Sequence, residues 1–93
     1  MSKINDLERI QECLDNYMMR TGRHEINEIE ANSALQRAGV LNDEAANPGK
    51  PLRDFLMWLR DNNHLPQNII QRYGLWKIRL SSTIAKFPLV LQF

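Results

Sequence analysis

The sequence predicts an α+β domain in which three helices are followed by a β-hairpin, and three observations predict this class. Residues 3–20, 27–38 and 51–62 each place apolar side chains at the spacing of three and four that is typical of a helix. From residue 75 the period changes to two, which is typical of a half-buried strand. A chain of 93 residues suffices for one small core, so we expect a single domain over 1–93.

The first helix is expected to begin at Ser2, a residue type that caps helix N-termini, and to end near Arg20. Thr21 and Gly22 supply the end, since glycine adopts the left-handed conformation that pairs the last carbonyls. Because the apolar stripe covers only about two heptads, packing on the rest of the domain is favoured over a coiled-coil dimer. The stripe consists of Ile4, Leu7, Ile10, Leu14, Tyr17 and Met18.

Residues 23–26 show no clear periodicity and fit either a loop or a small edge strand. Asn27 then has the character of an N-cap, with Glu30 three residues later as its capping-box partner. Gly39 stands where a helix-ending glycine belongs, and Val40 can fold back to complete the cap. The buried stripe of this second helix is predicted to be Ala31, Ala34, Leu35 and Ala38.

The third helix is expected over 51–62, after a loop at 41–50 that is rich in turn-forming residues. Pro51 suits a first helical turn because its missing N–H would be unpaired there, and Asp54 in the first turn agrees with the helix dipole. The apolar stripe is formed by Leu52, Phe55, Leu56 and Leu59, and Arg53, Met57 and Arg60 lie on its flank, facing water.

Two strands are expected after Pro66, at 68–72 and 75–80, joined across Tyr73 and Gly74. A short helix over 66–72 is the alternative for the first of them. Residues 84–93 (IAKFPLVLQF) are strongly apolar, so we expect this C-terminal tail to pack back onto the domain or to reach a second subunit.

Charge is distributed unevenly along the chain. Residues 1–49 hold five cationic and nine anionic side chains, whereas residues 50–80 hold six cationic and two anionic ones. This asymmetry indicates either a charged partner or attraction between the two halves. A single cysteine, Cys13, excludes an internal disulfide and favours a reducing, cytoplasmic location. Neither a secretory signal nor a membrane span is expected.

The candidate binding residues are the cations of the third helix and the hairpin. A helix fits the major groove of B-DNA, where arginine reaches guanine edges and lysine holds phosphates, and a neighbouring hairpin can follow the backbone. Against this, alternating cations on a strand are also an ordinary solvated face, and Asp54 and Asp61 weaken a groove contact. The candidate residues are Lys50, Arg53, Arg60, Arg72, Lys77 and Arg79.

Other chemistry has little support in the sequence. His24, His64 and Cys13 have no partners at metal-ligand spacing, and no nucleophile has a nearby base, so we expect no cofactor, no metal, no small-molecule substrate and no enzymatic activity. Residues 47–50 can seat an anion at a helix N-terminus but lack P-loop spacing. Glu25, Glu28 and Glu30 are interpreted as a solvated helix entrance, Trp58 and Trp76 as core residues, and Tyr73 as exposed.

The segments ANSALQRAGVL, PGKPLRDFLMWLR and GLWKIRLS together resemble a small bacterial winged-helix domain. The resemblance covers residues 24–81 and leaves the helix at 1–21 and the tail at 82–93 unassigned. It implies that 51–62 is the recognition helix of a helix-turn-helix and that 65–81 is the wing. The expected function is therefore non-enzymatic binding of double-stranded DNA in a regulatory module.

The alternative is a protein-interaction module or homodimer with no nucleic-acid role, because many winged helices bind proteins. In that case the first helix and the apolar tail are the expected contact surfaces.

Overall fold

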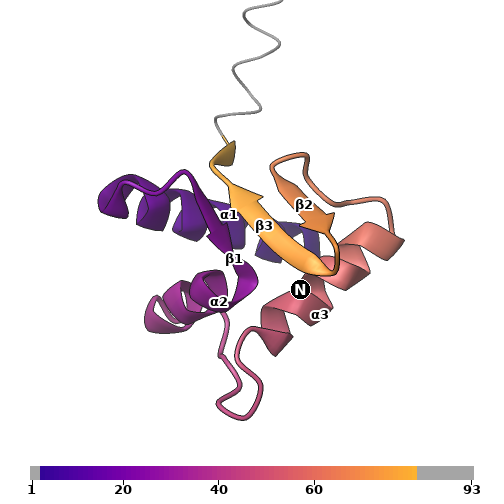
Figure 1. Ribbon diagram of the computed structural model, residues 1–93, viewed down its shortest axis with the longest axis horizontal. Coiled ribbons are helices and arrows are strands. Elements are labelled where there is room, and N and C mark those ends of the chain that lie inside the picture. The colour runs from indigo at the N-terminus through magenta and orange to yellow at the C-terminus, as the bar shows by residue number, and fades with distance from the viewer. Residues whose placement is uncertain (1–2, 82–93) are drawn as a thin grey trace, which may run out of the picture.

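The computed structural model describes residues 3–81 and contains three helices and three strands (Figure 1). The predicted α+β class is confirmed, and residues 23–26, left open between a loop and an edge strand, contribute to a third strand. The predicted cap at Ser2 and the tail at 82–93 lie outside the described residues. The elements are α1 (Lys3–Thr21), β1 (Glu25–Asn27), α2 (Glu28–Arg37), α3 (Lys50–Asp61), β2 (Ile69–Arg72) and β3 (Leu75–Arg79).

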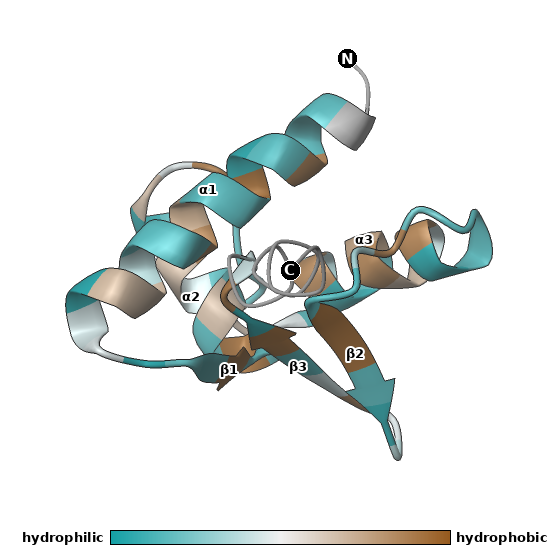
Figure 2. Cartoon of the chain, turned by 90° about the horizontal axis from the view of Figure 1, so that it is seen from above, coloured by the Kyte–Doolittle hydropathy of each residue, from teal (hydrophilic) through white to brown (hydrophobic). Residues whose placement is uncertain are grey.

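The sheet is antiparallel with the strand order β1-β3-β2, so the last strand lies between the other two. Ile26, Ile78 and Ile69 stand side by side across it and are buried. All three helices lie on this inner side of the sheet, and no helix or strand of residues 3–81 covers its outer side (Figure 2). The interpretation of 68–72 as a strand is confirmed, and the turn has positive φ at both Tyr73 and Gly74, as a two-residue type I′ hairpin requires.

The apolar stripe of α1 packs into the core of its own domain. Ile10, Leu14 and Met18 are buried, and Leu7 and Tyr17 pack against them. The helix ends as predicted at Gly22, whose φ is +72°. Because the centre of the stripe is buried within the molecule, it is not available as the seam of a coiled coil.

Two polar contacts join α1 to the strands. The amides of Gln11 and Asn68 exchange hydrogen bonds of 3.0 and 2.9 Å, and Asn68 also donates to the Arg79 carbonyl at 2.9 Å. Further along the helix, Asp15 accepts from the Ser81 backbone N–H at 3.0 Å and from its hydroxyl. These hydrogen bonds hold the sheet against α1. They involve residues that no periodic pattern in the sequence singles out.

Both ends of α2 are closed as the sequence predicts. Asn27 accepts a hydrogen bond of 2.8 Å from the Glu30 N–H, and the Val40 N–H donates to the Leu35 carbonyl at 2.9 Å around Gly39. The reciprocal half of the capping box is absent among the described contacts, since the Glu30 carboxylate binds Tyr17 and Arg23 instead. The prediction that Ala38 is buried was wrong, because the chain has already turned into the cap there and Ala38 is exposed.

The helix α3 buries Leu52, Leu56 and Leu59 completely, as its stripe predicts. It begins at Lys50, with Gly49 as its N-cap, one residue earlier than expected. Asp54 therefore lies beyond the first turn, so its predicted contact with the positive end of the helix dipole was wrong. Asp54 instead accepts a hydrogen bond from Lys50 Nζ at 2.8 Å.

Candidate nucleic-acid interface

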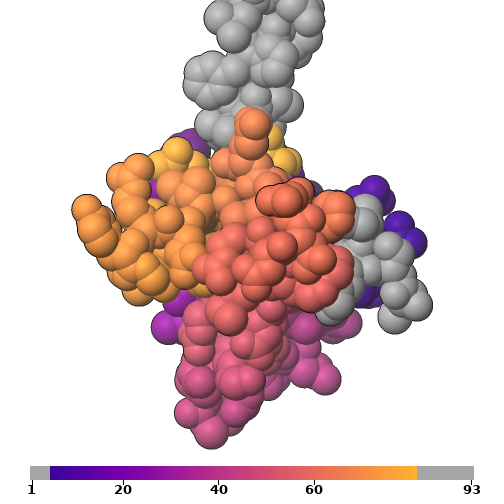
Figure 3. Space-filling model, turned by 90° about the vertical axis from the view of Figure 1, so that its right-hand side faces the viewer, coloured from indigo at the N-terminus to yellow at the C-terminus, as the bar shows by residue number. Residues whose placement is uncertain are grey.

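The candidate cations lie on two neighbouring elements, α3 and the β2–β3 hairpin, which adjoin on one side of the molecule (Figure 3). Arg60 connects them, because its Nη1 donates to Gln71 Oε1 of β2 at 2.6 Å, and its Nε lies 3.3 Å from Asp61 Oδ1. The hairpin is thereby held against the end of α3 by a residue that was itself predicted to contact DNA. Arg60 remains exposed.

Lys50 is exposed at the start of α3 and makes an ion pair one turn along the same helix. The Asp54 carboxylate accepts a hydrogen bond from the Lys50 ammonium and thereby raises the pKa of Lys50. An exposed ion pair of this kind is weak and opens readily, so the Lys50 ammonium can bind another anion instead.

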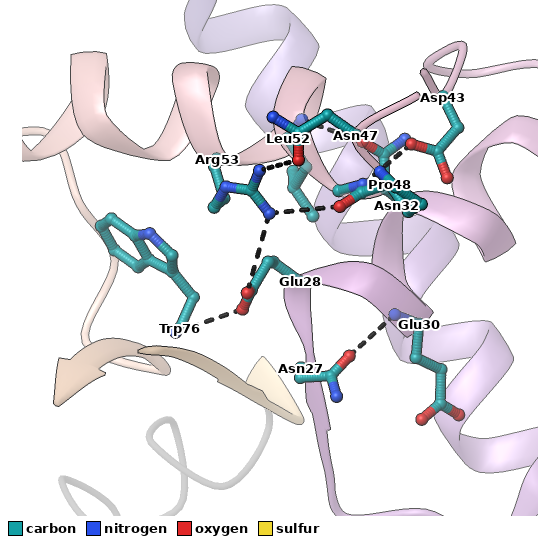
Figure 4. Close-up of polar contacts among 11 residues, drawn as sticks. Asn27, Glu28, Glu30, Asn32, Asp43, Asn47, Pro48, Leu52, Arg53 and Trp76 are labelled. Atoms are coloured by element: carbon teal, nitrogen blue, oxygen red, sulfur yellow. Dashed lines mark hydrogen bonds and ion pairs between the residues drawn. The ribbon is translucent and has the colours of Figure 1, made fainter. Parts of the chain in front are cut away.

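Arg53 is not the solvated residue that its position on the helix flank predicts, since only 26% of its side chain is exposed. Its guanidinium donates to Asn47 Oδ1 at 2.8 Å and to the Pro48 carbonyl at 3.2 Å, and it lies 4.0 Å from Glu28 Oε1 (Figure 4). Arg53 thus holds the loop before α3 against the start of α2.

The carboxylate of Glu28 is buried, with 6% of the residue exposed, which corrects its interpretation as part of a solvated helix entrance. Glu28 Oε2 accepts from the Trp76 backbone N–H at 3.2 Å (Figure 4). Because Arg53 lies beside the same carboxylate, Glu28 joins α2, α3 and β3. No periodic signal in the sequence distinguishes this glutamate from its half-buried neighbours Glu25 and Glu30.

The N-terminus of α3 does not provide the anion seat predicted at residues 47–50. The Asn32 amide, fully buried, accepts from the Leu52 N–H at 3.0 Å, and the Lys50 N–H donates to the Asn47 carbonyl at 3.1 Å. Pro51 has no N–H to offer. The donors of the first turn are therefore already paired within the protein.

Lys77 and Arg79 point from the outer side of the sheet and share one carboxylate, that of Glu25 on β1. Lys77 Nζ lies 3.7 Å and Arg79 Nε 3.0 Å from its oxygens. The hydrogen bond from Arg79 lowers the pKa of Glu25. The contribution of this cluster to stability is therefore complete above the ordinary pKa of a glutamate and is lost as the pH falls through the lowered value.

Arg72, at the end of β2, makes no ion pair with any residue of 3–81. Beside it Tyr73 is 97% exposed and Leu75 61% exposed, which confirms that Tyr73 stands at the tip. Trp76 is buried and Trp58 packs against the core, as predicted. The hairpin tip is thus a mixed cationic and apolar projection.

The described part of the chain contains no cluster of three or more His, Cys, Asp or Glu side chains able to hold a metal ion. None of its helices is long and apolar enough to cross a bilayer.

Comparison with known proteins found no match to a family model, to a curated protein or to a solved structure.

The loop geometry predicts that Gly49 is the least replaceable glycine. Gly49 and Gly39 both have positive φ, but a Cβ on Gly49 would lie 3.1 to 3.3 Å from Arg53, Ile29 and Glu28, whereas a Cβ on Gly39 meets nothing within 4 Å. Gly39→Ala should lower the free energy of unfolding by about 1–2 kcal/mol through backbone strain. Gly49→Ala should lower it by roughly 1–3 kcal/mol more through crowding. Urea titration compares the two, and equal losses would contradict this packing.

Arg53 and Lys50 provide a second comparison. Arg53→Gln removes the charge beside buried Glu28 and should cost about 1–3 kcal/mol of unfolding free energy, whereas Lys50→Gln should leave stability close to that of the parent. Chemical denaturation of both variants checks this. Similar stabilities would show that the Arg53 network does not support the fold.

Proposed function

We propose that residues 24–81 form a winged-helix module that binds double-stranded DNA through α3 and the β2–β3 hairpin, without catalysing a reaction. The observation that carries this proposal is the Arg60–Gln71 hydrogen bond, which holds a cationic hairpin beside a cationic helix. The order β1-α2-α3-β2-β3 within residues 24–81 supports it, since the winged-helix resemblance implies a recognition helix followed by a wing.

The dimensions of α3 suit the major groove. Its 12 residues extend over about 18 Å, and Lys50, Met57 and Arg60 are exposed outside its buried leucine stripe, together with Asp54 and Asp61. In this proposal Lys50 and Arg60 approach the groove while Arg72 and Lys77 contact phosphates from the hairpin. We assign no DNA contact to Arg53, because its side chain is bound within the protein, or to Arg79, which keeps its ion pair with Glu25.

Anionic side chains limit the strength of this interaction. Three carboxylates pair with one or two candidate cations each, namely those of Asp54, Asp61 and Glu25. DNA phosphates must displace these carboxylates in order to bind the cations. Among these cations Arg72 is the one with no ion pair inside residues 3–81, and it needs no such exchange. We therefore propose moderate, strongly salt-dependent binding.

The first test is fluorescence anisotropy of a labelled random-sequence duplex across a salt series. Contacts with about 3–5 phosphates should give a log–log slope of roughly −3 to −4. Arg72→Gln should weaken binding and make the slope shallower by about 1. Arg23→Gln, the same charge change at an exposed arginine outside the candidate set, should leave both values unchanged. Absence of binding at low salt, or equal effects of the two variants, would refute the proposed face.

A second test uses the competing carboxylate. Glu25→Gln releases Lys77 and Arg79 and should raise duplex affinity by up to about fivefold, the equivalent of one exposed ion pair. Glu8→Gln changes the net charge equally on exposed α1 and should have little effect. If both variants gained affinity equally, net charge rather than the hairpin would be responsible.

The alternative, a protein-interaction module or homodimer formed through the first helix and the tail, stays a prediction. Ile10, Leu14 and Met18 are already buried inside the domain, whereas Met19 of the same helix is 62% exposed and could contact a partner. Deletion of 84–93 followed by measurement of the oligomeric mass tests the contribution of the tail, and an unchanged oligomeric mass would argue against it.

A further inference from the structure

A second group of cations lies away from α3 and the hairpin, around a cavity between α1 and the end of α2. In Figure 1 α2 and the C-terminal end of α1 lie on the left of the molecule and α3 on the right. The cavity measures about 550 Å³, within the range of about 300–1,000 Å³ that is usual for small-molecule sites. Its lining includes Arg9, Glu12, Cys13, Tyr17, Arg20 and Arg37.

The aromatic ring of Tyr17 brings two of these arginines together. The guanidinium carbons of Arg20, on α1, and Arg37, on α2, each lie 5.8 Å from the centroid of this ring. The Tyr17 hydroxyl donates to Glu30 Oε2 at 2.7 Å, which fixes the position of the ring. Two guanidinium groups from different helices therefore lie around one ring in the lining of the cavity.

The positive charge around this cavity is only partly compensated within the described chain. Arg9, Arg20 and Arg37 make no ion pair with another residue of 3–81, and Glu12 is the one carboxylate in the lining. Burial raises the pKa of the Cys13 thiol, so it carries no negative charge near neutral pH. This differs from the α3 and hairpin cations, most of which are paired.

We propose that the cavity between α1 and α2 binds a small phosphate-bearing molecule. Guanidinium groups donate paired hydrogen bonds that match the oxygens of a phosphate, and they keep their charge at every physiological pH. The concave shape and the volume favour a compact ligand over a flat macromolecular surface. This site is independent of the DNA-binding face proposed above.

The test is a titration of the full chain with inorganic pyrophosphate at low salt, followed by ¹H–¹⁵N NMR. Saturable shifts are expected at the amides of Arg9, Cys13, Arg20 and Arg37. The double variant Arg20→Gln, Arg37→Gln should weaken binding at least about tenfold, since each charge-assisted hydrogen bond contributes strongly. Arg72→Gln, a neutralisation at the hairpin tip, should leave the affinity unchanged.

Three results would overturn the proposal. These are no saturable binding of pyrophosphate, equal weakening by Arg72→Gln, and shifts that localise on α3 or the hairpin. Duplex DNA is titrated in parallel, because its backbone also carries phosphates. If the double variant lost affinity for DNA while pyrophosphate failed to bind the parent, the cavity would be a nucleic-acid contact and not a small-molecule site. The single variants Arg20→Gln and Arg37→Gln, both at exposed positions, keep the test decisive if the double variant does not fold.

Discussion

The buried carboxylate of Glu28 is the contact on which the arrangement of α2, α3 and β3 depends. It accepts the Trp76 N–H from the sheet and lies beside Arg53, which in turn holds the loop before α3. A buried carboxylate is costly unless it is paired, so these partners must stay in place. The position of α3 relative to the hairpin, and with it the proposed DNA-binding face, follows from this requirement.

The same constraint divides the cations into two groups. The side chain of Arg53 is hydrogen-bonded to the loop before α3 and is not free to bind DNA. The ion pairs of Lys50, Arg60 and Lys77 are exposed, and a phosphate can replace the carboxylate in each of them. Exposed ion pairs contribute little to stability, so exchanging their partners costs little. A weakly basic chain can therefore present an anion-binding face once its own carboxylates are displaced.

Local sequence predicted local structure well. The stripe of α3, the caps of α2 at Asn27 and Gly39, and the two-residue turn at Tyr73 and Gly74 all depend on neighbouring residues, and all are present. The predictions for Ala38 and Asp54 failed at helix ends, because the bounds of α2 and α3 differ slightly from the predicted ones. Those for Glu28 and Arg53 failed because contacts outside their own helices hold their side chains. Glu28 accepts a hydrogen bond from the Trp76 N–H, 48 residues later in the chain, and no periodicity in the sequence predicts such a contact.

The sequence by itself determined the fold class, the order of the helices and the hairpin, and the list of candidate cations, because period, capping and charge are properties of adjacent residues. The tertiary structure decided which cations are free. It placed Arg53 against Glu28, paired Lys77 and Arg79 with a strand formed more than 50 residues earlier, and brought Arg20 and Arg37 to one aromatic ring. Electrostatic pairing depends on distances in space, which only packing of the elements sets.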